Sequence, residues 1–154
     1  MNKSILEKTR LEYIPKLPKV LRDGISEITI LEGNETKSVS DCQKINKLFP
    51  NTYGKKEITL KKGKNTSKVK KQVVGVILSG GQAPGGHNVI CGLYDALKGA
   101  NKENELYGFL GGPSGLIDHK YIELTSDIID EYRNTGGFDM IGSGRTKLEE
   151  TSQF

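Results

Sequence analysis

The sequence predicts an α/β fold with a parallel sheet in the second half of the chain, preceded by a smaller α+β extension. Apolar and helix-like segments alternate after residue 72, as in βαβ units. Fifteen of the 19 glycines also lie after that position. Residues 1–72 carry a net charge of +9, whereas residues 73–154 carry −5, so the composition changes at the same point. We therefore place a domain boundary near Lys71, with residues 1–72 as the extension.

The extension is expected to contain short helices and strands. A helix is predicted over 4–13, because Leu6, Thr9 and Tyr13 are spaced to share one face and prolines follow. The other expected elements are an extended segment at 14–18, a strand at 28–31 ended by 32–34, a helix at 40–49 capped by Ser40 or Asp41, and a hairpin arm or loop at 51–71.

From residue 73 onward, strands and helices are expected to alternate. In order they are a strand at 73–79, a glycine loop, a helix at 88–99, a strand at 105–110, a second glycine loop at 111–117, a short strand at 120–124 and a helix at 125–134. The last helix is expected to be capped by Thr125 or Ser126 and to stop at Gly136 and Gly137. This order favours parallel strands joined by right-handed crossovers. Residues 147–154 resemble the start of another helix, so we expect an incomplete sheet in a truncated chain.

Composition limits the class of protein. An apolar content of 34% and a charged content of 27% are typical of a soluble globular protein. No run of 18 apolar residues and no apolar signal region occurs, so we expect a cytoplasmic protein without a membrane partner. Cys42 and Cys91 are isolated, and their spacing predicts neither a zinc site nor a disulfide framework.

Lys55–Lys71 is strongly basic, with eight lysines and a single acid, Glu57. Such a stretch could contact nucleic acid or another polyanion. It contains no arginine, however, and no aromatic residue follows Tyr53 that could stack on a base. A solvated lysine-rich loop is the favoured interpretation, and we do not expect a nucleic-acid partner.

The most specific chemical feature is the segment Ser79–Asn88, with the sequence SGGQAPGGHN. It follows the apolar run Val73–Leu78 and precedes the expected helix Val89–Lys98. Glycines can adopt positive φ and bring successive N–H groups close to an anion, and the helix amino terminus adds its dipole. The pattern therefore predicts a phosphate-binding loop. The alternative is a glycine-rich turn that merely joins strand to helix.

The spacing excludes two common phosphate loops. Gly81 and Gly86 have the separation of a P-loop, but His87 and Asn88 replace its Lys-Ser/Thr pair. The dinucleotide pattern GxGxxG is absent, and no acidic residue ends a clear second strand to bind a ribose. The loop therefore belongs to another class.

Ser79–Asn88 closely resembles the SGGxAPG loop of phosphofructokinases, in the version typical of the long, pyrophosphate-dependent enzymes. Four other segments are similar to the same family: 13–18, 51–54, 106–116 and 132–145. The resemblance covers nearly the whole chain. It implies a phosphofructokinase-like, three-layer Rossmann-like fold, of which residues 73–154 would form the first part of the donor-phosphate-binding domain.

The resemblance also implies an activity. Enzymes of this family transfer a phosphoryl group from pyrophosphate to the 1-hydroxyl of fructose 6-phosphate in glycolysis, with Mg²⁺, and the full-length enzyme would be a homo-oligomer. Their Gly-Gly-Asp-Asp metal motif and the Thr-Ile-Asp loop that supplies the base do not occur in this sequence. We therefore expect no catalytic base and no metal ligand here, and an N-terminal fragment that is inactive alone.

The resemblance assigns the donor phosphate to four residues. Gly80 and Gly81 would offer backbone N–H groups, and Arg145 would place its guanidinium against the donor. An arginine suits this role because its planar fork binds two oxygens and keeps its charge. Alternatively, Arg145 caps or pairs with a nearby surface acid such as Glu149 or Glu150. Thr146 would lie near the donor or cap a following helix.

Gln82 and His87 are two further possible neighbours of the donor. Gln82 stands where ATP-dependent relatives have an Asp, and the absence of that negative charge favours pyrophosphate. Pro113 and Ser114 stand where those relatives place an aromatic residue near the nucleotide. His87 is either a phosphate neighbour or a packing residue at the helix start.

Three functions stay open on the sequence alone. The first is pyrophosphate-dependent transfer, and the second is the same fold using ATP. The third is a non-catalytic module, either a regulatory subunit or a basic binding protein that uses Lys55–Lys71.

Overall fold

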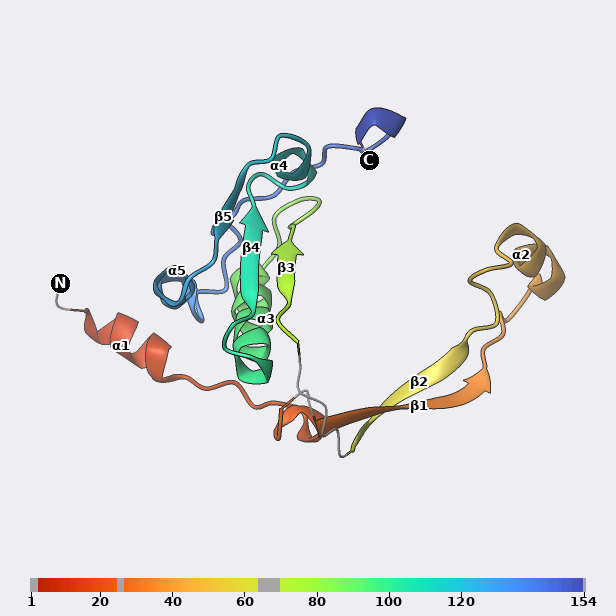
Figure 1. The fold of residues 1–154 in the computed structure, drawn as a ribbon, viewed down its shortest axis with the longest axis horizontal. Helices are drawn as coiled ribbons and strands as arrows, with labels where there is room; N and C mark the ends of the chain where they lie inside the picture. Colours follow the sequence, from red (N-terminus) through yellow and green to blue (C-terminus); the bar gives the residue numbers. More distant parts are fainter. Residues whose placement is uncertain (1–2, 25–26, 64–69, 154) are drawn as a thin grey trace. The chain divides into compact units, whose positions relative to one another are not determined.

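The computed structural model describes residues 3–24, 27–63 and 70–153 (Figure 1). The chain divides into two compact units, Leu17–Ser67 and Met1–Lys16 together with Lys68–Phe154. The helix near the amino terminus thus groups with the second half of the chain. We retain the division at residue 72 as a proposal about functional parts.

The unit Leu17–Ser67 is built on a two-stranded arm. Its elements are the 3₁₀ helix η1 (Lys19–Leu21), strand β1 (Ile28–Glu35), helix α2 (Cys42–Leu48) and strand β2 (Lys56–Lys62). The two strands are antiparallel, with Ile30 opposite Leu60. The segment 51–71, predicted as a hairpin arm or loop, thus contributes strand β2, whose partner among the described residues is β1. The predicted end of the first strand at residue 31 is wrong, because β1 continues through an irregularity between Glu32 and Glu35.

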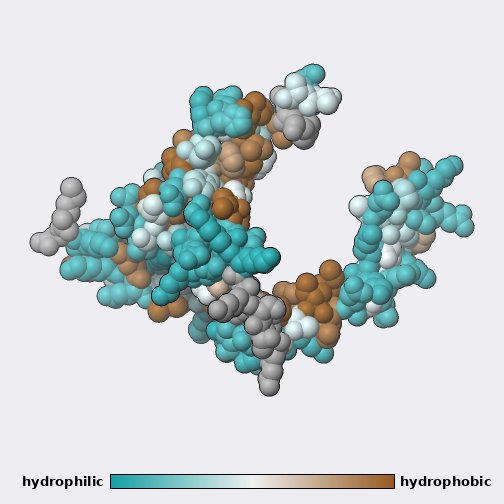
Figure 2. Space-filling view, in the orientation of Figure 1, coloured by the Kyte–Doolittle hydropathy of each residue, from teal (hydrophilic) through white to brown (hydrophobic). Residues whose placement is uncertain are grey.

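The arm exposes apolar side chains. Ile30, Ile58 and Leu60 are largely exposed, and hydrophobic surface is visible over the paired strands in Figure 2. The register places these three side chains on one face of the arm, because partners opposite each other point to the same side. Part of the basic stretch, residues 64–69, lies outside the described residues.

Helix α2 confirms the predicted helix within 40–49 and one of its two predicted cap positions. Asp41 is the N-cap residue, yet it has a left-handed backbone (φ 53°), and its side chain makes no capping hydrogen bond. Cys42, the first residue of the helix, instead has Ser38 as its hydrogen-bond partner. Local side-chain contacts of this kind are not visible in the helical pattern.

The other unit contains a three-stranded sheet. Its elements are α1 (Ile5–Glu12), β3 (Val73–Val76), α3 (Gly86–Ala100), β4 (Glu105–Phe109), α4 (Pro113–Ile117), β5 (Tyr121–Glu123), α5 (Ser126–Tyr132) and the 3₁₀ helix η3 (Thr151–Gln153). The strand order is β3-β4-β5. Strands β3 and β4 are parallel, as expected for a βαβ unit.

The expectation that all strands of this sheet are parallel is wrong, because β5 is antiparallel to β4. The eleven residues between the two strands hold only the five-residue helix α4. A parallel return needs a crossover of about a dozen residues or more, usually with a full helix. The described residues therefore form a mixed α/β structure with small sheets, without a complete parallel Rossmann sheet.

The core lies between the sheet and helices α3 and α5. Ile90 and Cys91 of α3, Leu106 of β4 and Ile129 of α5 are buried, together with Leu78, Leu124, Met140 and Ile141. The opposite face of the sheet is an open groove lined by apolar and aromatic side chains such as Tyr107, Phe109 and Tyr121. Within the described ranges, no helix is long and apolar enough to cross a membrane.

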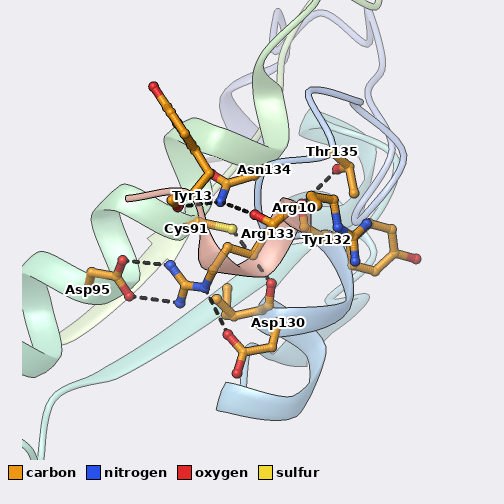
Figure 3. A network of polar contacts seen from close by, with 10 residues as sticks. Arg10, Tyr13, Cys91, Asp95, Asp130, Tyr132, Arg133, Asn134 and Thr135 are labelled. Carbon is orange, nitrogen blue, oxygen red and sulfur yellow. Dashed lines mark hydrogen bonds and ion pairs between the residues drawn. The ribbon is translucent and has the colours of Figure 1, made fainter. Parts of the chain in front are cut away.

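Helix α1 forms as predicted, and Asn134 binds the chain at its carboxyl end. Ser4 caps it by accepting the Glu7 N–H at 3.1 Å. At its other end the carbonyls of Arg10 and Tyr13 both accept from Asn134 Nδ2, each at 2.9 Å (Figure 3). Asn134 follows α5 in a left-handed backbone conformation (φ 58°), from which its side-chain amide reaches both carbonyls.

Helix α5 ends earlier than predicted. Its last residue is Tyr132. The first left-handed residue after the helix is Asn134, which precedes the predicted stop at Gly136 and Gly137. The adjacent Arg133 binds Asp95 through both Nη atoms, at 2.7 and 3.0 Å, and Asp130 through Nε at 2.8 Å (Figure 3). These contacts connect α5 to α3.

The core predicts unequal effects of two neighbouring substitutions in α5. Ile129 is fully buried, whereas Ile128 packs at the margin of the core. We expect Ile129→Ala to lower the free energy of unfolding by about 2–5 kcal/mol, and Ile128→Ala by less than about 2 kcal/mol. Urea titration followed by circular dichroism measures both. Ile128 and Ile129 are the same residue type in the same helix. Equal losses of unfolding free energy would therefore contradict the deeper burial of Ile129 in this core.

Candidate functional site

The glycine loop after β3 is fixed by a segment far along the chain. Ser79 pairs with Gly144 as an isolated parallel bridge, and the Gly80 N–H donates to the Gly144 carbonyl at 2.9 Å. Gly80 has φ 105°, a conformation that requires glycine, although a Cβ there would meet no atom within 4 Å. The Gly80 amide is thus already used. This residue shapes the loop through its backbone conformation, and its role as a donor to phosphate stays a prediction.

Arg145 lies against the same loop. A Cβ built on Gly81 would be 2.7 Å from Arg145 Nη2, so the guanidinium occupies the space beside the Gly81 backbone. Within the described ranges Arg145 forms no ion pair, and Glu149, one of the two acids considered as its alternative partner, pairs with Lys147 at 3.5 Å. The structure therefore brings Gly81 and Arg145 together and leaves the side chain of Arg145 exposed.

The second glycine loop meets the first through Gly144. The Gly111 N–H donates to the Ile141 carbonyl at 2.8 Å. A Cβ on Gly144 would overlap the carbonyl oxygen of Gly111, and a Cβ on Gly112 would overlap the backbone nitrogen of Gly144. The loop after β3, the loop after β4 and the segment 140–145 thus pack backbone to backbone. Ends of neighbouring parallel strands are the usual location of binding sites in α/β proteins.

The start of α3 is paired with residues 136–137. The Gly85 N–H donates to the Gly136 carbonyl at 2.8 Å, and the His87 N–H donates to the Gly137 carbonyl at 2.9 Å. A Cβ on Gly86 would overlap the Phe138 ring. Among the described residues of this loop and the start of α3, the N–H groups of Gly81, Gln82, Ala83, Gly86 and Asn88 have no hydrogen-bond partner. These are the amides that could bind an anion.

His87 is a buried, neutral side chain with both ring nitrogens in use. Its side chain is 2% exposed. Nδ1 lies 2.6 Å from Thr135 Oγ1, which itself donates to the Tyr132 carbonyl at 2.7 Å, so the proton lies on Nδ1. Nε2 accepts the Met140 N–H at 2.9 Å. This geometry favours packing at the helix start over contact with phosphate.

The environment of His87 favours the neutral ring. Burial lowers its pKa, because a charged imidazolium would lose its hydration. The carboxylate of Asp139, 3.0 Å from Nε2, opposes this shift, but it is largely exposed and its effect is smaller. Sequence reasoning missed Thr135 and Asp139, because nothing in the local pattern relates them to His87.

The remaining predicted residues are at the surface. Gln82 and Thr146 are exposed, and no helix begins at Thr146 for it to cap. Ser114 is not free, because its hydroxyl donates to the Gly111 carbonyl at 3.0 Å. Pro113 occupies the first turn of α4, the usual helix position for proline, and this signal could have identified the helix within the predicted loop. Within the described ranges, no group of three or more His, Cys, Asp or Glu could hold a metal ion.

Comparison with known proteins identifies homologues over the full chain. The chain is 54% identical to a pyrophosphate–fructose 6-phosphate 1-phosphotransferase of Porphyromonas gingivalis, 49% identical to one of Entamoeba histolytica and 44% identical to one of Treponema pallidum. Each match covers all of this chain and 28% of the relative, so the chain spans about 28% of the length of these proteins. No family model matches the chain.

The backbone packing predicts that Gly144 does not tolerate a side chain. We expect Gly144→Ala to destabilise the protein by about 1–3 kcal/mol. The new methyl group would overlap the backbone carbonyl of Gly111, which cannot move away cheaply. The matched control is Gly99→Ala in α3, where a Cβ would meet open space and alanine favours the helix. Thermal or urea unfolding measures both. Equal effects would show that the loops are not packed in this way.

The burial of His87 predicts a pH dependence of stability. Because its folded pKa lies below the ordinary value of about 6.5, the unfolded chain takes up the proton first as pH falls. The contribution of His87 is therefore complete above about pH 6.5 and is lost as the pH falls through the lower, folded pKa. Urea titrations between about pH 7.5 and 5 measure this, and we expect His87→Gln to remove the decrease.

The control for this measurement is His119→Asn, which removes the other, exposed histidine at a left-handed position that asparagine tolerates. The decrease should persist in that variant. Its loss there, or its persistence in His87→Gln, would refute the assignment.

Proposed function

We propose that this chain, which is homologous over its full length to pyrophosphate–fructose 6-phosphate 1-phosphotransferases, provides the site that binds the phosphoryl donor in such an enzyme. The reaction transfers a phosphoryl group from pyrophosphate to the 1-hydroxyl of fructose 6-phosphate and gives fructose 1,6-bisphosphate. The observation that carries the proposal is the guanidinium of Arg145 beside Gly81, at the end of β3.

The chemistry of the transfer suits this arrangement. Phosphoryl transfer spreads negative charge over the equatorial oxygens, so catalysis depends on positioning and on fixed positive partners. Arg145 would bind two oxygens through its planar fork, and the Gly81 N–H would donate to a third. We also propose that residues 73–154 belong to a three-layer, phosphofructokinase-like sheet, supported by the parallel pairing of β3 with β4 and of Ser79 with Gly144.

Two features of the site favour pyrophosphate over ATP. Gln82 follows the glycine pair and brings no negative charge toward a compact, highly charged donor. The segment 110–117 contains no aromatic ring that could stack on a base, and the hydroxyl of its Ser114 is used within the loop. A donor without a nucleobase needs no aromatic ring for stacking, and the uncharged Gln82 does not repel its phosphates.

Relatives of this kind generally use Mg²⁺, but the described residues offer no cluster of ligands that fits it. Carboxylates are the protein ligands that Mg²⁺ prefers. No acid forms an ion pair with Arg145 within the described residues. We therefore assign neither metal binding nor proton abstraction to residues of this chain. Their proposed role is to bind and orient the donor.

The proposal predicts a specific loss on substitution of Arg145. We expect Arg145→Gln to weaken pyrophosphate binding by about 10- to 100-fold, because a charged hydrogen bond contributes about 1.5–3 kcal/mol. Arg145→Lys should retain part of the affinity, since a lysine keeps the charge without the fork. Isothermal titration calorimetry with pyrophosphate, and with ATP in parallel, provides the measurement.

The matched control is Lys147→Gln, which removes the same charge two residues away from a side chain that is 80% exposed. We expect it to change the affinity by less than about twofold. If both variants lose affinity equally, the effect is one of net charge and the assigned contact is wrong. Equal binding of ATP and pyrophosphate would contradict the choice of donor.

A further inference from the structure

We propose that His87 is a positioning residue for the donor site: its imidazole fixes the backbone of Met140 and thereby holds Arg145 against Gly81. This inference rests on the proposed function of Arg145. It assigns to His87 an action through the segment 140–145, without contact to the phosphate.

The connection from His87 to Arg145 is short, and the intervening residues are hydrogen-bonded. It begins where Nε2 accepts the Met140 N–H at 2.9 Å. Met140 and Ile141 are then buried in the core, and the Ile141 carbonyl accepts the Gly111 N–H. The Gly144 carbonyl accepts the Gly80 N–H immediately before Arg145. A shift of Met140 would therefore be carried directly to the arginine.

The same residue also holds the other side of this turn. The His87 N–H donates to the Gly137 carbonyl at 2.9 Å, and a Cβ on Gly137 would be 2.7 Å from His87 Cε1. His87 thus contacts the chain both before and after Phe138 and Asp139. Its backbone fixes one end of the turn 137–140 and its side chain fixes the other.

The tautomer of the ring is set from the opposite side. Nδ1 donates to Thr135 Oγ1, which donates to the Tyr132 carbonyl, so that Nε2 keeps a free electron pair for Met140. The Tyr132 ring contacts the imidazole edge to face, with centroids 4.7 Å apart. Thr135 and Tyr132 both lie in the network that also holds Asn134 and Arg133 (Figure 3).

Asp139 is the charged group that faces the imidazole. Its Oδ1 is 3.0 Å from Nε2, and the side chain is 78% exposed. A protonated Nε2 would donate to this carboxylate, and Met140 would lose its acceptor. The positioning role therefore requires the neutral ring, and Asp139 offers a variant that separates the two contacts.

The test uses the full chain and two substitutions at position 87. In His87→Leu the acceptor is lost, and we expect hydrogen exchange of the Met140 and Gly80 amides to accelerate by at least about fivefold. Pyrophosphate affinity should fall by a similar factor. In His87→Gln the side-chain carbonyl can accept the Met140 N–H, so most of both effects should be reversed.

The tautomer and the arginine are measured independently of binding. Long-range ¹H–¹⁵N correlation spectra should show His87 protonated on Nδ1 and unprotonated on Nε2. A nuclear Overhauser effect between the Arg145 guanidinium and the Gly81 α-protons should be present in the wild type and lost in His87→Leu. If the wild type binds no pyrophosphate, the proposed function fails, while these spectra still decide the positioning.

Two further variants keep the test decisive if His87→Leu does not fold. Asp139→Asn should leave the Met140 exchange rate unchanged, because its carboxylate is not the partner of that amide. Thr135→Val removes the acceptor of Nδ1–H and should shift the tautomer and speed Met140 exchange. Unchanged exchange in both His87→Leu and Thr135→Val, or a protonated Nε2 in the wild type, would overturn the proposal.

Discussion

The backbone packing of residues 136–144 against the two glycine loops is the constraint on which the candidate site depends. Carbonyls of Gly136, Gly137 and Gly144 accept amides of the first loop and the start of α3, and the Ile141 carbonyl accepts an amide of the second loop. At Gly144 this approach leaves no room for a Cβ. The glycines are therefore needed here mainly to let three backbone segments touch, and only some of their amides stay free for a ligand.

Arg133 and Arg145 lie in the same unit but have different surroundings. Arg133 is held by Asp95 and Asp130, which raise its pKa further above its usual range, and it connects two helices. Arg145 has no acidic partner among the described residues and lies beside the backbone of Gly81. Residues 73–154 carry a net negative charge, so an arginine that forms no ion pair within the described ranges is unusual there. In the proposed function this charge binds the donor.

The sequence pattern was sufficient for the elements whose signals are local. Alternation of apolar segments predicted β3, α3, β4 and α5, and Ser4 correctly marked the start of α1. The direction of β5 was missed because it depends on the length of the connection and on packing against β4. The hydrogen-bond partners of Gly80 and His87 were not predicted for the same kind of reason. Their partners lie at Gly144 and Met140, and the partner of His87 is 53 residues away in the sequence.

The pairing of the first glycine loop with residues 136–144 has a consequence for synthesis of the chain on the ribosome. The loop emerges from the exit tunnel early, but the carbonyls that fix it are added at least 50 residues later. Until then the amides of Gly80, Gly85 and His87 have only water as a partner. The first glycine loop is thus translated before it can adopt its native conformation, and the last of these contacts, to the Gly144 carbonyl, is made together with the synthesis of Arg145.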